Sequence, residues 1–149
     1  MAATAWQVYV KAKKKIGNGV IKLGTDLFKV QLHTSASNAS VAVTAAGYSL
    51  ASSVTNEVSS GNGYTTGGKS LASRVWTISS TAIKFDGADI VWTASGGTIA
   101  NIKFAVLRNS AGGSAHAVAF SKLTTAQFTL ADGNTLTLQF ATAGIFTLE

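Results

Sequence analysis

The chain has no cysteine and no proline, and only 12% of its 149 residues are charged, about half of the ~25% found in typical domains. Without cysteine there can be no disulfides, thiolate metal ligands or cysteine nucleophiles. Without proline, the turns have to be formed by glycine, asparagine, aspartate and serine. No apolar run approaches the ~18 residues of a membrane-spanning helix, so we expect no membrane partner.

Side chains suited to catalysis are scarce, because the chain has six acidic residues and two histidines. Asp86 and Asp89 form the closest carboxylate pair, but they flank a Gly-Ala turn, where aspartate commonly bonds its own backbone. His33 and His116 stand at the ends of expected strands, without metal-ligand spacing. We therefore expect no catalytic, cofactor-binding or metal site, and no enzymatic activity.

The glycine-rich segment 61–68 (GNGYTTGG) invites comparison with a phosphate-binding loop. Its glycine spacing differs from that motif, and a strand rather than a helix is expected after it. We therefore do not expect a nucleotide cofactor. Tyr64, in the middle of the segment, is a candidate contact residue for a protein partner.

The net charge of +6 is concentrated near the N-terminus, where Lys11, Lys13, Lys14 and Lys15 lie close together. Such a run can be a solvated helix face, a contact for an acidic protein surface, or a nucleic-acid contact. Arginines and aromatic residues that would contact bases are not interleaved with it, which makes nucleic acid the least favoured partner. We take these four lysines, with Tyr64, as the candidate partner contacts.

A short helix is expected over residues 4–16, because the apolar residues at 6, 9, 10 and 16 fall close to one face. Thr4 would cap its start, and the sequence GNG at 17–19 would end it. Residues 6–10 also alternate between apolar and polar, so a strand there is an open alternative. Segment 1–19 is expected to form a helix or arm on a β-sandwich of residues 20–149, in a single domain.

The rest of the chain has the spacing of short strands, with Ile83 and Phe85 expected to point inward. Segment 34–60 is expected to be an excursion with a weak strand at 41–43 and a short helix near 48–54. Residues 132–134 (DGN) predict a hairpin between the strands on either side. The pattern indicates an all-β fold, a jelly-roll-like antiparallel sandwich. The expected strands are 20–23, 27–32, 71–79, 81–86, 90–94, 98–107, 116–120, 128–131, 136–140 and 145–148.

Several blocks of sequence resemble a family of short virion proteins of tailed bacteriophages. They are residues 12–19 (AKKKIGNG) running into 21–30 (IKLGTDLFKV), then 56–58 (NEV), 61–71 (GNGYTTGGKSL) and 85–95 (FDGADIVWTAS). In order and spacing the resemblance covers roughly residues 8–149. Lys103, Arg108 and the loop 110–114 stand where the family often has an aromatic-rich strand and an acidic hairpin, which leaves the partner surface open.

Members of this family are head decoration (cement) proteins, head-fibre proteins or other virion proteins. The resemblance implies a jelly-roll sandwich that binds the major capsid protein on the capsid exterior as a homo-oligomer, with a trimer favoured over a dimer, and it implies no catalytic residues. The main alternative is a tail or fibre component that contacts host glycans through exposed aromatic side chains. Tyr64, Trp76 and Trp92 are the candidates for that role, although the tryptophans also suit a core.

Overall fold

The computed structural model describes residues 4–40, 51–110 and 115–148, and it confirms an all-β antiparallel, sandwich-like fold with one short helix in that part of the chain. A single turn of 3-10 helix covers Ala51–Ser53. The other elements are β1 (Gln7–Val8), α1 (Val10–Gly17), β2 (Phe28–Thr34), β3 (Lys69–Ser70), β4 (Val75–Ser79), β5 (Ala82–Asp86), β6 (Ile90–Thr93), β7 (Ile99–Asn109), β8 (Ala117–Lys122), β9 (Phe128–Leu130), β10 (Thr135–Leu138) and β11 (Phe146–Leu148).

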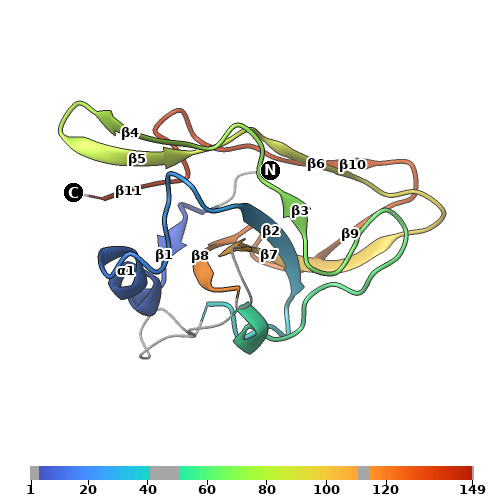
Figure 1. Cartoon of the computed structure of the whole chain (residues 1–149). Coiled ribbons are helices and arrows are strands. Elements are labelled where there is room, and N and C mark those ends of the chain that lie inside the picture. Colours follow the sequence, from blue (N-terminus) through green and yellow to red (C-terminus); the bar gives the residue numbers. More distant parts are fainter. Residues whose placement is uncertain (1–3, 41–50, 111–114, 149) are drawn as a thin grey trace.

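The main sheet is built around the long strand β7, which is its centre (Figure 1). Its strand order is β1-β8-β7-β2-β3, and β9 pairs with the first residues of β7. Residues 104–107 of β7 are all buried, as expected for a strand covered on both faces. This agrees with the sequence pattern, which is apolar on both sides over the same residues.

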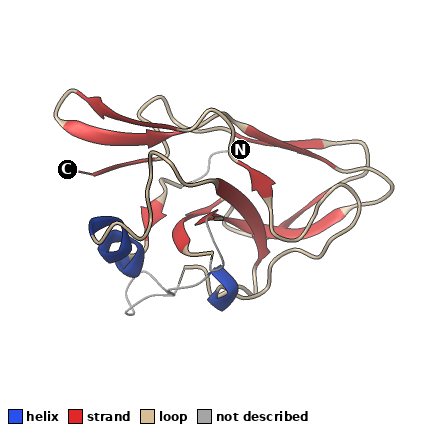
Figure 2. Cartoon of the chain, in the orientation of Figure 1, coloured by secondary structure: helices blue, strands red, loops and turns tan. Residues whose placement is uncertain are grey.

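Two smaller antiparallel sheets complete the body, as the strands in Figure 2 show. One has the order β11-β5-β4, and the other is the two-stranded ribbon of β6 and β10. Phe28 of β2 packs edge-on against Phe85 of β5 at 5.0 Å between ring centroids, and Phe85 lies 5.3 Å from Phe146 of β11. These aromatic contacts join the three-stranded sheet to the main sheet.

The N-terminal segment combines both structures that its sequence allows. Gln7 and Val8 pair with β8, and the helix begins only at Val10, so the expected start at residue 4 is wrong. Thr4 does not cap the helix, because its hydroxyl and its N–H bond the backbone of Lys122 instead. The helix ends at Gly17 with Asn18 as its C-cap, one residue beyond the expected end and within the GNG sequence that was predicted to stop it. Tyr9 and Ala12 belong to the same apolar cluster as the sheets.

Two expected strand features are wrong. Residues 20–23 form no strand, although Ile21 and Leu23 are buried and their neighbours exposed, as in a strand. The turn at 132–134 forms, but β9 and β10 do not pair with each other. Instead β9 pairs with β7 and β10 pairs with β6, so the turn carries the chain between sheets. The expected strand at 41–43, and the residues before 51 of the helix near 48–54, lie outside the described residues.

Candidate protein-binding surface

The helix α1 holds three of the four predicted contact lysines in solvent. Its inner side is fixed by Ala12, which is buried, and by the residue before the helix, Tyr9, whose hydroxyl donates to the carbonyl of Ala39 at 2.8 Å. Lys11, Lys13 and Lys14 are exposed, and Lys15 is half-buried. Within the described ranges the structure has one ion pair, Lys84 with Asp86, so none of these lysines is paired with a described acidic residue.

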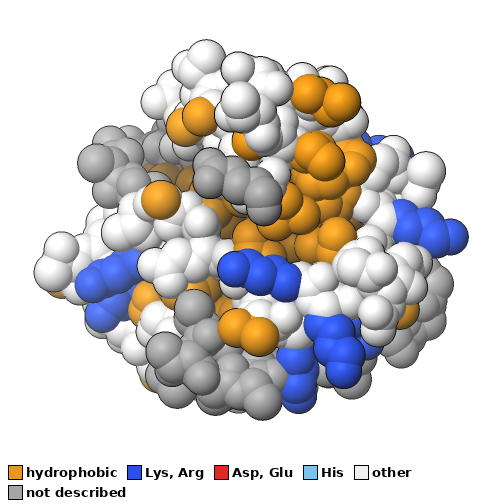
Figure 3. Space-filling model, turned by 90° about the vertical axis from the view of Figure 1, so that its left-hand side faces the viewer, with side chains coloured by type: hydrophobic (Ala, Val, Ile, Leu, Met, Phe, Trp, Pro, Cys, Tyr) orange, Lys and Arg blue, Asp and Glu red, His pale blue; other side chains and the backbone are white. Residues whose placement is uncertain are grey.

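The face that carries α1 and the end of the β4–β5 hairpin combines basic and apolar groups. Figure 3 looks onto this side of the molecule and shows apolar side chains in a hollow, lysine and arginine side chains around it, and no acidic side chain among the described residues. Such a face favours a partner that is both apolar and acidic, because burial of apolar surface and opposite charge both stabilise the contact.

The sheet β11-β5-β4 extends past the core with one apolar face. Cross-strand partners in an antiparallel sheet share a face, and here two rows of such partners follow each other. The inner row, Trp76, Phe85 and Phe146, packs on the core. In the outer row Ile78 is 77% exposed and Ile83 39% exposed, with Leu148 half-buried beside them.

The inward position predicted for Phe85 is therefore correct, but Ile83 lies on the same face beyond the edge of the core. Nothing in the alternation of the sequence distinguishes a covered row from an overhanging one. Sequence analysis therefore missed this overhanging row, which consists of Ile78, Ile83 and Leu148.

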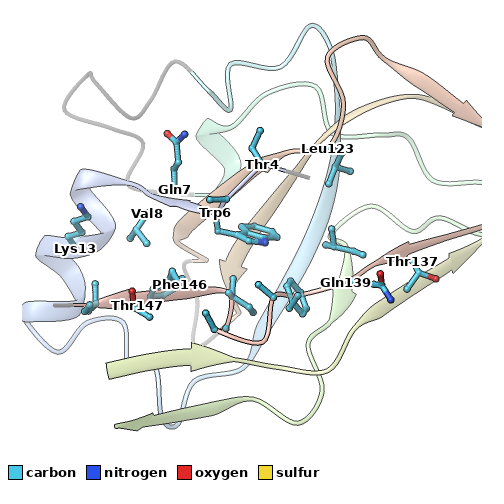
Figure 4. A pocket seen from close by; sticks show the side chains of 18 of the residues that line it. Thr4, Trp6, Gln7, Val8, Lys13, Leu123, Thr137, Gln139, Phe146 and Thr147 are labelled. Atoms are coloured by element: carbon cyan, nitrogen blue, oxygen red, sulfur yellow. The ribbon is translucent and has the colours of Figure 1, made fainter. Parts of the chain in front are cut away.

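A groove of about 1170 Å³ runs between the N-terminal strand and the C-terminal segment (Figure 4). Residues 4–8 line one wall, and residues of 136–148 line the other. Trp6 points into the space between the walls and lies 6.0 Å from Phe140, measured between ring centroids. Within the described part of the chain, Lys13 is the one charged residue that lines the groove.

Tyr64 does not belong to this surface, because it is only 2% exposed, and its selection as a partner contact is wrong. Its hydroxyl donates to Oε1 of Glu57 at 2.7 Å and accepts the N–H of Leu32 at 2.9 Å. Burial and the bond to Glu57 both raise the pKa of the phenol. Trp92 is also buried and Trp76 half-buried, so the three aromatic residues proposed for glycan contact form no exposed platform.

The glycine-rich segment is fixed to the sheet by Glu57 and Arg108. Glu57 also accepts the N–H of Gly67 at 2.6 Å and the side-chain amide of Gln31 at 2.7 Å. The guanidinium of Arg108 donates twice to the carbonyl of Gly67, at 2.8 and 3.1 Å. The polar groups of Tyr64 and Gly67 therefore form hydrogen bonds inside the fold. Sequence analysis missed this role of Glu57.

Of the four groups considered for catalysis, Asp86, Asp89 and His33 have structural partners, whereas Nδ1 of His116 has no hydrogen-bond partner among the described residues. Asp86 accepts the N–H of Gly87 and pairs with Lys84, and Asp89 accepts the N–H of Phe140 at 2.9 Å. His33 is buried, and Nδ1 lies 2.9 Å from the carbonyl of Thr55. Across 4–40, 51–110 and 115–148, no three His, Asp or Glu side chains are grouped as metal ligands.

In the same described part, no helix has the length and apolar character to cross a membrane. In comparisons with protein-family models, with curated proteins and with solved structures, no match to this chain was found. The candidate surface is therefore inferred from the geometry of this chain alone.

Proposed function

We propose that this chain is a virion structural protein of the capsid-decoration type, which binds the major capsid protein on the exterior of the phage head and stabilises the shell. It does so as a homo-oligomer, with a trimer favoured over a dimer. The observation that carries the proposal is the basic and apolar face formed by α1 and the overhanging sheet. The role is binding and structural rather than enzymatic.

The arrangement of α1 supports this function. Ala12 and Tyr9 hold the helix against β8, so Lys11, Lys13 and Lys14 are presented from a fixed backbone. Pre-organised charges steer an acidic partner into one orientation and lose less entropy on binding than charges on a loose tail. The block of residues 12–19 that resembles phage virion proteins includes Lys13 and Lys14, which is a second support.

The overhanging row supports it in a different way. A side chain such as Ile78, 77% exposed, contributes little to folding but can bury apolar area against a partner. A capsid repeats the same subunit many times, so each copy of an oligomeric decoration protein adds a contact. Several modest contacts then hold the oligomer with high avidity.

Co-sedimentation with heads assembled without this protein tests the proposal. The wild-type chain is expected to bind to saturation with a fixed ratio to the capsid subunit. The charge-reversed triple variant Lys11→Glu, Lys13→Glu and Lys14→Glu is expected to bind at least about tenfold more weakly, because attraction becomes repulsion at three sites.

A matched triple variant controls for net charge. Lys22→Glu, Lys69→Glu and Lys103→Glu change the charge by the same amount at residues outside α1 and outside the groove. This variant should keep most of its affinity. The α1 variant should unfold at the same temperature as the wild type, whereas the control should unfold slightly earlier, because it loses the bond of Lys69 to the carbonyl of Val91 and the contact of Lys103 with the Phe104 ring. Equal loss in the two variants, or no saturable binding by the wild type, would contradict the proposal.

A further inference from the structure

The groove lies between two strands that each form the outer edge of a sheet. β1 is the last strand of the main sheet, and β11 is the last strand of the three-stranded sheet. Residues of both line the same space. We propose that this groove binds an extended segment of another protein as an added β-strand, with alternating apolar side chains and a carboxylate that lies against Lys13.

The backbone of β1 is oriented to pair with an added strand. The N–H of Tyr9 donates to the carbonyl of Val118, and this pair continues the register Gln7–Phe120 and Val8–Ala119. Bonded and non-bonded pairs alternate in an antiparallel ladder, so the N–H and C=O of Val8 point away from β8. Val8 lines the groove, and its backbone groups are therefore available to an incoming strand.

The size and lining of the groove favour a peptide over a small molecule. About 1170 Å³ exceeds the roughly 300–1,000 Å³ of typical small-molecule sites. The walls carry apolar side chains at spacings suited to the alternate residues of a strand, including Trp6, Val8, Phe146 and Leu148.

The charge of the groove indicates which charge its partner should carry. Lys13 is the one charged residue among the described residues that line the groove, and the neighbouring face shows basic side chains and no described acidic side chain. Two copies of this chain that met face to face here would bring like charges together. The complementary occupant is an apolar segment of a different protein that carries at least one carboxylate.

This inference deepens the proposed function, since a strand from a capsid subunit would seat the decoration protein on the shell. It is tested without capsids. The full chain is titrated into the peptide TVTVTVE-amide, labelled with fluorescein at its N-terminus, and binding is followed by fluorescence anisotropy. One control peptide ends in lysine instead of glutamate, and another has alternate backbone nitrogens methylated, which removes hydrogen-bond donors and retains the side chains.

The glutamate peptide is expected to bind with one site. The lysine peptide and the methylated peptide should each bind roughly tenfold more weakly, because one loses the charge contact and the other the strand hydrogen bonds. Lys13→Glu should reverse the preference between the glutamate and lysine peptides. Lys22→Glu, an exposed lysine that does not line the groove, should leave that preference unchanged.

Equal binding of the methylated peptide would overturn strand addition, and an unchanged preference in Lys13→Glu would overturn the placement of the carboxylate. Absence of peptide binding by a chain that still binds capsids would overturn this inference and leave the proposed function standing. Peptide binding by a chain that does not bind capsids would support the groove and contradict the decoration role.

Discussion

The hydroxyl of Tyr64 donates a hydrogen bond of 2.7 Å to Oε1 of Glu57. The same hydroxyl accepts the buried N–H of Leu32, so one phenol connects the glycine-rich segment, the excursion before it and β2. This contact explains why a segment that looks like a ligand-binding loop in sequence is a fixed part of the body.

Tyr64→Phe removes that hydroxyl and leaves the N–H of Leu32 buried without this acceptor. We expect the free energy of unfolding to fall by about 1–3 kcal/mol, the usual cost of an unsatisfied buried group. Urea denaturation followed by circular dichroism measures it. Thr77→Val removes an exposed hydroxyl from β4 and should change stability by no more than about 0.5 kcal/mol. Equal effects of the two substitutions would show that the Tyr64 contact is not structural.

Gly68 and Gly133 share a φ of +80°, but their surroundings differ. A Cβ on Gly68 would lie 2.2 Å from the carbonyl oxygen of Val30, whereas one on Gly133 would meet nothing within 4 Å. Gly133→Ala should cost about 1–2 kcal/mol for the left-handed backbone alone. Gly68→Ala should cost clearly more, because the segment must also move away from β2. Thermal unfolding measures the loss of stability in each variant. Equal losses in the two variants would contradict close packing of Gly68.

The pKa of His33 is lowered, first because burial disfavours the charged ring, although the Thr55 carbonyl and Glu57 act in the other direction. As pH falls below about 6.5, the unfolded chain takes up a proton that the folded chain does not, so stability decreases toward acid. The slope contributed by this one group is at most about 1.4 kcal/mol per pH unit.

Denaturant unfolding of the wild type and of His33→Gln, from about pH 8 to pH 5, isolates this effect around the ordinary pKa of histidine. The difference in unfolding free energy between the two proteins should be constant above neutrality and should shift against the wild type in acid. Parallel pH profiles would show that His33 titrates alike in the folded and unfolded states.

Phe85 and Ile78 lie on the same face of adjacent strands, one covered and one overhanging. Phe85→Ala should destabilise the fold by about 3–5 kcal/mol, as expected for a large buried side chain. Ile78→Lys should change stability by no more than about 0.5 kcal/mol, because its side chain is mostly in solvent. Calorimetry distinguishes them, and a large loss on changing Ile78 would mean that the overhang is covered within a single chain.

The sequence predicted the architecture well where local pattern and burial agree. The inward position of Phe85, the doubly apolar strand at 104–107 and the end of the helix within 17–19 agree with the sequence predictions. Each depends on contacts that a short window of residues determines.

The wrong predictions concern features that are determined by contacts between residues far apart in the sequence. Residues 20–23 have the burial of a strand, but no strand in the described part of the chain pairs with them. The turn at 132–134 is correct in its local chemistry, yet turn residues do not determine which strand β9 or β10 will pair with. The prediction of Tyr64 as a partner contact fails because its hydroxyl bonds Glu57 and Leu32 inside the fold.

A reconstruction of the virion tests the central claim most directly, because it locates the chain on the particle. The account predicts density for this fold on the outer capsid surface, with α1 and the overhanging row of Ile78 and Ile83 against the major capsid protein. Density found only in the tail or fibres, or a capsid-bound chain with α1 facing solvent, would contradict it.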